Sequence, residues 1–275
     1  MPDQNRRFSP RALRNLGYES VVGLLAASSV LLLVAPTLII LVMSFTGDML
    51  LRFPPRSWSG RWYLELVDNS PQLLASAWVS IQVALIATVA AGTLGTLAAL
   101  AIAGKRSNWA VALDAFFMSP MVFPAMSLGL AMLLLLSAIG VRPALWALSI
   151  GHTVIVTPFV IRMVSASVQQ LNRSLLDASS SLGAGRLFTF FHVTLPLIRP
   201  GLIGGGIIAF LSSIDHVPVS LMLSDPRIET LPVNMWTLLD TNLDVRVASI
   251  SGVIVAITLL VILLLDRRLL GNVAR

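Results

Sequence analysis

The chain alternates between long apolar segments and shorter polar ones. Six apolar segments have the length that a helix needs to cross a bilayer, about 20 residues. They lie at residues 21–45, 73–103, 118–138, 144–164, 198–223 and 248–265. Backbone groups inside hydrocarbon must bond to one another, so each segment is predicted to be helical. Pro120 and Pro124 predict an irregular start to the third segment, while Gly204-Gly205-Gly206 and Pro218 predict interruptions in the fifth.

Composition indicates an integral membrane protein. Of the 275 residues, 56% are apolar and 12% are charged, whereas a soluble domain carries about 25% charged residues. The sequence has no cysteine, which excludes disulfides, thiolate metal sites and cysteine nucleophiles. We attribute the net charge of +6 to orientation in the membrane and expect no nucleic-acid partner, because Lys and Arg in short loops stay cytoplasmic.

The basic residues predict that both termini are cytoplasmic. With the N-terminus inside, 13 of the 19 Lys and Arg residues fall in cytoplasmic segments and 6 in outer ones. The inner residues are Arg6, Arg7, Arg11, Arg14, Lys105, Arg106, Arg162, Arg173, Arg186, Arg199, Arg267, Arg268 and Arg275. We therefore expect a cytoplasmic tail at residues 1–20, a first membrane helix at 21–45, a periplasmic loop at 46–72 and a second cytoplasmic tail at 266–275.

The sequence lacks a reactive constellation. His152, His192 and His216 lie far apart, and none has ligand-like spacing to another histidine or to a carboxylate pair. Gly104-Lys105-Arg106-Ser107 fails as a phosphate-binding loop, because Ala99 stands where the first glycine is needed and Arg106 where Ser or Thr must follow the lysine. We therefore expect no catalytic residue, metal or cofactor, and any ATP hydrolysis on a separate chain.

The inner loop at residues 165–196 is patterned. An apolar stripe at helical spacing predicts a short amphipathic helix formed by Leu171, Leu175, Ala178 and Leu182. Ser174 and Asp177 are spaced as a capping box, and Gly183 is placed to end the helix in a left-handed turn. A second apolar piece at 187–193 is expected to stop at Pro196. Periodicity alone leaves two interpretations open, a docking helix in the cytosol or an interfacial helix on membrane lipid.

The same loop resembles the EAA signature of bacterial ABC importer permeases. The resemblance is carried by Asp177-Ala178-Ser179, by Gly183 after three further residues, and, after nine more residues, by Val193-Thr194-Leu195-Pro196. Asp177, Ser179 and Val193 depart from the usual Glu, Ala and Ile. The resemblance implies a coupling helix that seats in a cytoplasmic ATPase. It assigns that role to Asp177, Ala178, Ser179, Leu182, Gly183, Leu195 and Pro196.

Further segments resemble the spermidine/putrescine (polyamine/opine/phosphonate-type) permease subgroup. These are residues 119–124, 211–219, 230–233 and 244–251, so the resemblance runs from about residue 73 to 265. His216 replaces an acidic residue of that pattern, and Arg246 also departs from it. The subgroup implies putrescine or spermidine as the small-molecule solute, with thiamine, iron(III), phosphonate and opine importers as alternatives.

The resemblance also implies an architecture and an assembly. We expect an all-α integral membrane protein of the bacterial inner membrane, with the six-helix type I ABC importer permease fold and a permease core of five helices at residues 73–265. It would pair with a second permease subunit, identical or not, with two cytoplasmic ATPase subunits and with a solute-binding protein. The outer stretch 224–246 would meet the binding protein, or Trp236 would anchor it at the lipid headgroups.

Asp215 lies inside the apolar segment 198–223, where an ionised carboxylate costs about 2.5–3.5 kcal/mol at the centre of a membrane helix. Either Asp215 and His216 line the translocation path of a cationic solute, or Asp215 pairs with a backbone group, an arginine or His216 to fix packing. Gly201-x-x-x-Gly205 and Gly92-x-x-Gly95 predict close helix packing.

Two functions of other classes, an ion-coupled secondary transporter and a membrane enzyme, each require features that can be sought in the sequence. An ion-coupled secondary transporter needs matching helix breaks in two halves, and the glycine-rich break occurs in one half only. A membrane enzyme needs a reactive constellation, which the sequence lacks.

Overall fold

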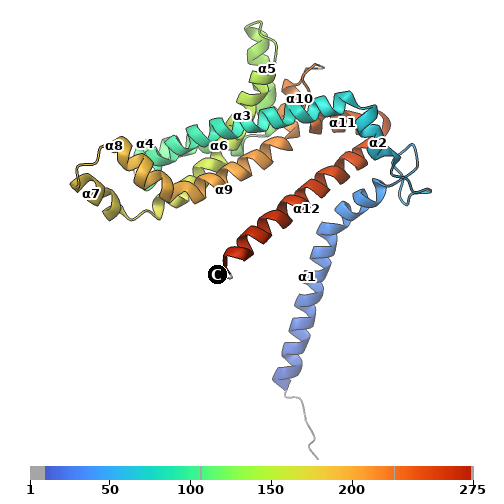
Figure 1. Cartoon of the computed structure of the whole chain (residues 1–275), viewed down its shortest axis with the longest axis horizontal. Coiled ribbons are helices and arrows are strands. Elements are labelled where there is room, and N and C mark those ends of the chain that lie inside the picture. The colour runs from blue at the N-terminus through green and yellow to red at the C-terminus, as the bar shows by residue number, and fades with distance from the viewer. Residues whose placement is uncertain (1–9, 106, 226, 274–275) are drawn as a thin grey trace, which may run out of the picture. The chain divides into compact units, whose positions relative to one another are not determined.

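The computed structural model describes residues 10–105, 107–225 and 227–273, and these are helical almost throughout (Figure 1). The long helices are α1 (Pro10–Met43), α3 (Pro71–Ile102), α6 (Leu145–Gln169), α9 (Leu195–Ile214) and α12 (Arg246–Val273). The shorter ones are α2 (Arg61–Asp68), α4 (Asn108–Val122), α5 (Ala125–Ala138), α7 (Arg173–Ser181), α8 (Arg186–Thr189), the π-helix η1 (Phe190–Thr194), α10 (Val217–Leu223) and α11 (Leu231–Asn242). Arg6, Arg7, Arg106 and Arg275, on which part of the orientation prediction rests, lie outside the described residues.

Four helical stretches of the described chain are long and apolar enough to cross a membrane. They are Val21–Met43 within α1, α3, α6, and the run Arg186–Ile214 that joins α8, η1 and α9. The pair α4 and α5 adds a fifth if it counts as one span, and α12 contributes a shorter apolar stretch, Arg246–Leu260. The all-helical membrane class is confirmed, and the count of six spans stays a prediction.

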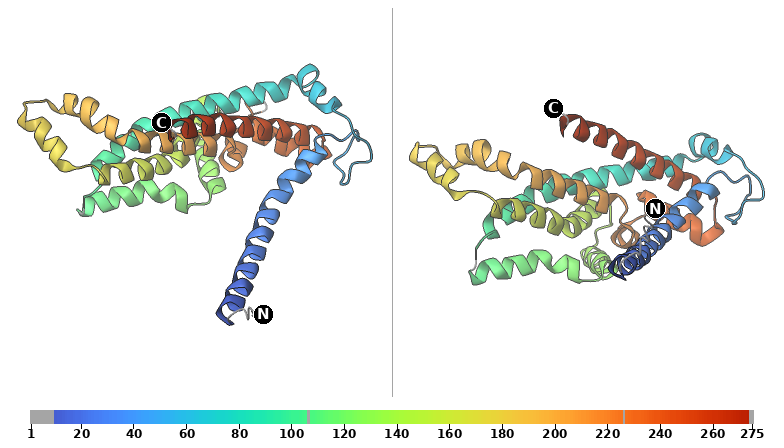
Figure 2. Two further views of the ribbon diagram at one scale, coloured as in Figure 1. Left: turned by 60° about the horizontal axis from the view of Figure 1, so that its bottom comes forward. Right: turned by 90° about the horizontal axis from the view of Figure 1, so that it is seen from below.

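The chain divides into two compact units. The central unit runs from Pro71 to Thr237, and the terminal unit contains the residues up to Ser70 and from Leu238 onwards. The central unit is built around α3, α6 and α9, which lie side by side (Figure 2). The core between them is made of small and β-branched residues, which include Val83, Ala87, Ala91, Val156, Val160, Ile198 and Ala209.

Glycines on α9 allow this close packing. A Cβ added at Gly201 would lie 2.6 Å from the carbonyl oxygen of Met163, and one at Gly205 would lie 3.1 Å from the Cα of Val160. Both positions face α6, as the small-xxx-small spacing predicts. On α3, a Cβ at Gly95 would lie 3.0 Å from Val160, whereas one at Gly92 would meet only Leu202 at 4.0 Å.

The irregular start predicted for the segment 118–138 is confirmed. The structure places α4 and α5 there, bent by 99°. The bend lies at Phe123, whose ψ of 144° is extended. Pro124 explains it, because a proline disfavours the helical conformation in the residue before it. Pro120 is accommodated inside α4.

Of the two interruptions predicted in the segment 198–223, the one at Pro218 is confirmed and the one at Gly204-Gly205-Gly206 is wrong. Helix α9 continues through these glycines to Ile214 and breaks at Asp215 and His216, after which α10 begins. The physical reason is Pro218 in the first turn of α10, which has no N–H to donate to the carbonyl of Ile214. The glycines are instead used for packing against α6.

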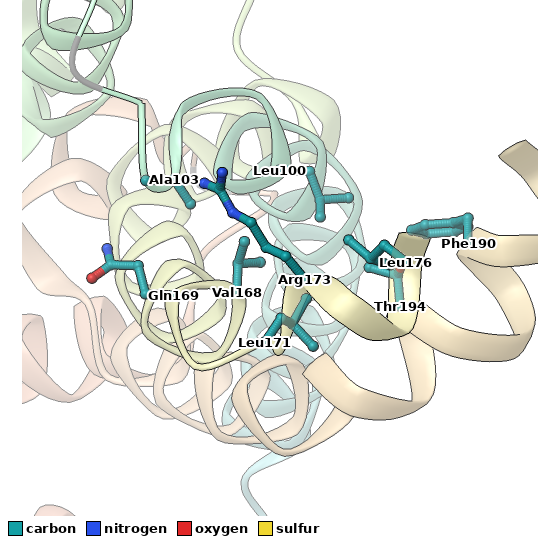
Figure 3. Close-up of a pocket in the computed structure, with 10 residues that line it drawn as sticks. Leu100, Ala103, Val168, Gln169, Leu171, Arg173, Leu176, Phe190 and Thr194 are labelled. Carbon is teal, nitrogen blue, oxygen red and sulfur yellow. The ribbon is translucent and has the colours of Figure 1, made fainter. Parts of the chain in front are cut away.

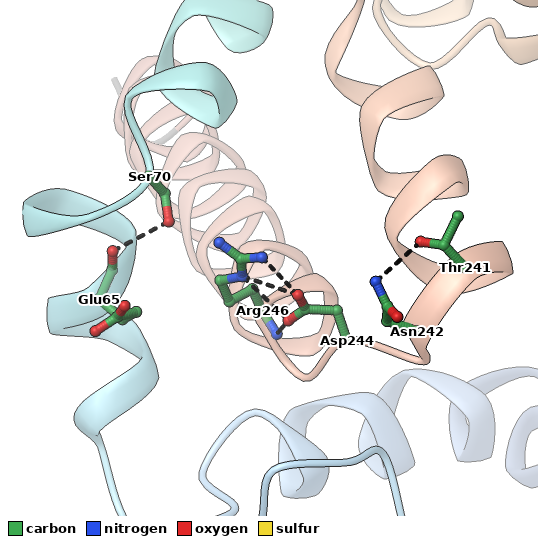
Figure 4. Close-up of polar contacts among 6 residues, drawn as sticks. All are labelled: Glu65, Ser70, Thr241, Asn242, Asp244 and Arg246. Carbon is green, nitrogen blue, oxygen red and sulfur yellow. Dashed lines mark hydrogen bonds and ion pairs between the residues drawn. The ribbon is translucent and has the colours of Figure 1, made fainter.

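Polar contacts join the ends of α1, α2 and α12 in the terminal unit. Tyr63 donates to the Oγ of Ser44 at 2.7 Å, and the Oγ of Ser249 donates to the carbonyl of Ser44 at 3.3 Å. Next to them, the guanidinium of Arg246 bonds both carboxylate oxygens of Asp244 (Figure 4). Partial burial raises the pKa of Asp244, but the hydrogen bonds from Arg246 outweigh this effect, and the pKa is lowered overall.

Candidate coupling loop and helix break

Helix α7 is the central element of the inner loop. Its N-cap is Asn172, whose Oδ1 accepts a hydrogen bond from the N–H of Ser174 at 3.1 Å. The predicted capping box of Ser174 and Asp177 is therefore wrong, because Ser174 already lies inside the helix and Asn172, a favoured N-cap residue, takes the capping position. Asp177 sits in the middle of α7 with its side chain exposed.

The C-terminus of α7 confirms the left-handed turn predicted at Gly183, whose φ is +79°. The N–H of Gly183 donates to the carbonyl of Ser180 at 3.0 Å, and the N–H of Ala184 donates to that of Ser179 at 3.1 Å. These two bonds form a Schellman motif, which satisfies carbonyls that the last turn of a helix otherwise leaves free. The direction in which the chain leaves α7 therefore depends on one glycine.

One face of α7 is fastened to the helix that follows it. The Oγ of Ser179 lies 2.8 Å from the Oγ1 of Thr189 on α8, and Ser179 is only 9% exposed. Ser179 is the position at which the loop departs from the alanine of the resembled signature. The hydroxyl thus supplies a bond between α7 and α8 that an alanine cannot make.

Away from this contact, much of α7 is open. Asp177 and Ala178 are exposed, as is Leu175, and Leu182 directly after the helix is 88% exposed. Apolar side chains on a protruding helix lose the free energy of burial unless another surface covers them. Of the apolar stripe expected from the sequence, Leu175, Ala178 and Leu182 are exposed, whereas Leu171 lies before α7 and packs against the core of the central unit.

A cavity of about 370 Å³ lies between α7 and the ends of α3 and α6 (Figure 3). The guanidinium of Arg173 extends into it toward Ala103. The cavity is lined by Leu100, Ala103, Gly104, Val168, Gln169, Leu171, Arg173, Leu176, Phe190 and Thr194. Protein interiors are otherwise closely packed. A space of this size therefore means that α7 does not pack directly on the ends of α3 and α6.

The prediction that the apolar piece 187–193 stops at Pro196 is wrong. A single helical run extends from Arg186 to Ile214 and contains the π turn Phe190–Thr194 just before Leu195 and Pro196. The N–H of Leu195 bonds to the carbonyl of Phe190, five residues back. A π turn widens the helix locally, so Pro196 fits in the first turn of α9 although it has no N–H to donate.

At the far end of the same run, Asp215 and His216 form the break between α9 and α10. Asp215 is exposed and caps α9, while His216 is half-buried and precedes α10. In the described chain the carboxylate of Asp215 makes neither a hydrogen bond nor an ion pair, and the guanidinium of Arg162 lies 3.6 Å from the carboxylate of Asp114 instead. Of the two alternatives for Asp215, pairing to fix helix packing therefore has no side-chain partner among the described residues.

Sequence reasoning passed over one residue at this break. His152 on α6 is 1% exposed and contacts Ser213 on α9 and Ser220 on α10. The available signal was a lone histidine in the middle of the apolar segment 144–164, where an unpaired polar group would be unfavourable. Its partners were not visible, because they lie 61 and 68 residues away along the chain.

These elements suit mechanical and electrostatic tasks. Among the described residues no group of three or more His, Asp and Glu side chains could hold a metal ion. What the central unit offers is an exposed helix at one end of a continuous helical run and an exposed carboxylate at the other.

The sequence matches the family described as binding-protein-dependent transport system inner membrane component over residues 91–272. The putrescine transport system permease protein PotI of Escherichia coli (strain K12) is 31% identical over 212 residues, 74% of this chain and 75% of PotI. The spermidine/putrescine permease PotC of the same organism is 25% identical over 231 residues, 83% of this chain and 86% of PotC. A putative 2-aminoethylphosphonate permease, PhnV of Salmonella paratyphi A, is 29% identical over 204 residues, 71% of this chain and 76% of PhnV.

Solved structures share the fold. A chain of a bacterial ABC transporter that imports alginate superposes with a TM-score of 0.68 at 17% identity, covering 95% of this chain and 98% of its own. A chain of the MetNI methionine ABC transporter gives 0.60 at 19% identity, covering 75% of this chain and 100% of its own. With its apolar helices, the protein is a multi-pass component of the bacterial inner membrane, and it is a transport subunit rather than an enzyme. The chain belongs to the binding-protein-dependent inner-membrane components, the permease subunits of ABC importers.

Proposed function

We propose that this permease imports a small polyamine, putrescine or spermidine, and that α7 couples it to a cytoplasmic ATPase. In this proposal the chain pairs with a second permease, two ATPase subunits and a solute-binding protein, and both termini are cytoplasmic. The observation that carries the proposal is the continuous helical run Arg186–Ile214, which joins the α7–α8 turn to the break at Asp215.

The coupling step is supported by the shape of the loop. Helix α7 presents exposed apolar side chains, Leu175 at 45% and Leu182 at 88% exposure, which a partner surface would cover. Force applied to α7 passes to α8 through the turn at Gly183 and the bond between Ser179 and Thr189. The run of 29 residues from Arg186 to Ile214 is about 43 Å long at 1.5 Å per residue, which is longer than the hydrocarbon core of a bilayer.

The choice of solute is supported by charge and by the relatives. Asp215 is an exposed carboxylate at the break directly after the apolar run Arg186–Ile214, and an acid inside a membrane protein usually faces a cavity or a path. A negative group on the path favours a cationic solute over an anionic one. The printed names of PotI and PotC, putrescine and spermidine/putrescine permeases, point to the same class.

The proposal is tested by ATP-driven uptake of radiolabelled putrescine into proteoliposomes that hold the assembled transporter, with the binding protein added outside. Replacement of Asp215 by asparagine keeps the shape of the side chain and removes its charge. We expect uptake to fall roughly tenfold, the effect of losing about 1.4 kcal/mol of charge interaction. Asp68→Asn, which alters an exposed acid at the end of α2, serves as the control and should leave uptake unchanged. Equal uptake by both variants would refute the path role of Asp215.

A second solute class is favoured by one observation, the 29% identity to a putative 2-aminoethylphosphonate permease. That solute carries a phosphonate group, which Asp215 would repel. Uptake of labelled 2-aminoethylphosphonate by the wild type, together with a gain in the Asp215→Asn variant, would favour the phosphonate reading over the polyamine one.

A further inference from the structure

Helix α6 meets both sides of the break between α9 and α10 through a single side chain. The Nδ1 of His152 lies 2.7 Å from the Oγ of Ser213, in the last turn of α9. The Nε2 of His152 lies 2.8 Å from the Oγ of Ser220, in α10. Ser213 is two residues before Asp215, and Ser220 is four residues after His216. We call His152, Ser213 and Ser220 the His152 cluster.

The hydrogen bonds of the cluster assign the protons of the ring. The Oγ of Ser220 donates its proton to the carbonyl oxygen of His216 at 2.7 Å. The same oxygen can then only accept from His152, so the Nε2 of His152 carries a proton. A neutral imidazole has one donor and one acceptor, which leaves the Nδ1 of His152 to accept from the Oγ of Ser213. Every polar side-chain atom of the cluster then has a partner.

The three residues are buried among apolar helices. His152 is 1%, Ser213 2% and Ser220 0% exposed. A buried hydrogen bond is expensive to leave unmade, so a movement that separates α6 from either side of the break meets resistance. The bond from Ser220 adds a side-chain donor to the carbonyl of His216, the N-cap residue of α10, and so holds the hydroxyl of Ser220 in place against His152.

The ring of His216 reaches the same place and stays outside the cluster. Its centroid lies 5.7 Å from that of His152, with the two planes at 77°. Within the described chain, the Nε2 of His216 is buried and has no hydrogen-bond partner. The fixed ring of His152 therefore also limits where His216, and the backbone that carries Asp215, can lie.

We propose that His152 is a positioning residue for the translocation path: it ties α6 to both sides of the α9–α10 break and so fixes the place of Asp215. Pro218 makes the break, and the His152 cluster sets its geometry. The inference rests on the proposed role of Asp215 in passing a cationic solute. Movement of the run Arg186–Ile214 is then transmitted to α10 through the cluster instead of being absorbed by a flexible joint.

The absence of cysteine in the chain allows a direct test of position. Asp215→Cys is introduced as the single thiol, and its rate of reaction with a cationic methanethiosulfonate is measured in the assembled transporter. His152→Leu, which removes both hydrogen bonds, is expected to change this rate by at least roughly fivefold, because the loss of even one typical hydrogen bond changes a population by about that factor. His152→Gln keeps a donor and an acceptor and should restore a rate close to that of His152.

Ser149→Ala is the matched control. Ser149 is a buried serine on the same helix, and its Oγ bonds only to the carbonyl of Leu145 in that helix, at 2.8 Å. It should leave the labelling rate unchanged. If His152→Leu fails to insert, Ser213→Ala removes one arm of the cluster while leaving α6 intact, and it should change the rate in the same direction. Equal rates in His152→Leu, Ser213→Ala and Ser149→Ala would overturn the proposal.

Uptake of labelled putrescine by the same variants, with Asp215 retained, separates this inference from the proposed function. We expect His152→Leu to lose roughly tenfold in uptake rate and His152→Gln to recover most of it. If Asp215→Asn transports normally while the labelling rate still depends on His152, the path role of Asp215 is wrong and the positioning of the break stands. If Asp215→Asn loses uptake while labelling is indifferent to His152, the positioning role is wrong and the path role stands.

Discussion

Substitution of Gly183 by alanine tests the coupling proposal at its narrowest point. No atom lies within 4 Å of the position that a Cβ at Gly183 would occupy, so alanine causes no clash. The φ of +79° is the difficulty, because an L-residue in this region is strained by about 1–2 kcal/mol. The substitution therefore changes backbone energy and almost nothing else.

This strain acts on the turn that joins α7 to α8. If the turn relaxes, the two Schellman bonds to Ser179 and Ser180 are lost, and α7 no longer keeps its direction. A penalty of about 1–2 kcal/mol reduces the population of the native turn roughly 5- to 30-fold relative to its alternatives. The solute moved per ATP hydrolysed should fall, while the ATPase subunits keep their own activity.

The measurement is the ratio of putrescine uptake to phosphate release in proteoliposomes of the assembled transporter. Gly185→Ala is the matched control, because Gly185 also has open space around its Cβ position but has an ordinary φ of −66°. Gly183→Asn should be milder than Gly183→Ala, since asparagine tolerates the left-handed region better. An unchanged ratio in Gly183→Ala at normal expression would refute the role of this turn in coupling.

Three further outcomes follow from the contacts. Ser179→Ala and Thr189→Val should each lower the uptake-to-hydrolysis ratio, and the double variant should be no worse than either, because both remove one bond; additive losses would contradict this. Gly201→Leu should reduce the folded, inserted protein seen by size-exclusion in detergent, since its side chain would collide with α6, whereas Gly92→Leu in the open position should not. The pKa of Asp244 is lowered from 3.8, so its pair with Arg246 stabilises the terminal unit at pH values above 3.8. This stabilisation is lost as the pH falls through the lowered pKa of the folded protein. The melting temperature of the wild type should therefore exceed that of Asp244→Asn at pH 7, and the difference should vanish on acidification.

The inner loop allowed the family to be predicted without a structure, and the comparisons confirm the family. The signature residues are close together in sequence, and a glycine at position 183 indicates a left-handed backbone conformation that few other residues adopt. The residues of the loop do not share one role, however. Ser179 is fastened inward to Thr189, while Asp177 and Leu182 are exposed.

Local pattern by itself determined the membrane class, the approximate position of each apolar segment and the left-handed end of α7. These depend on hydropathy and on single-residue backbone preferences, which act over a few positions. Pro218 also marked the break after α9 in advance. Tertiary structure decided that α9 continues through its glycines, which pack against α6. It also decided that His152 holds both sides of that break. Such outcomes depend on which neighbour fills the space or supplies the hydrogen bond, and those neighbours come from distant parts of the chain.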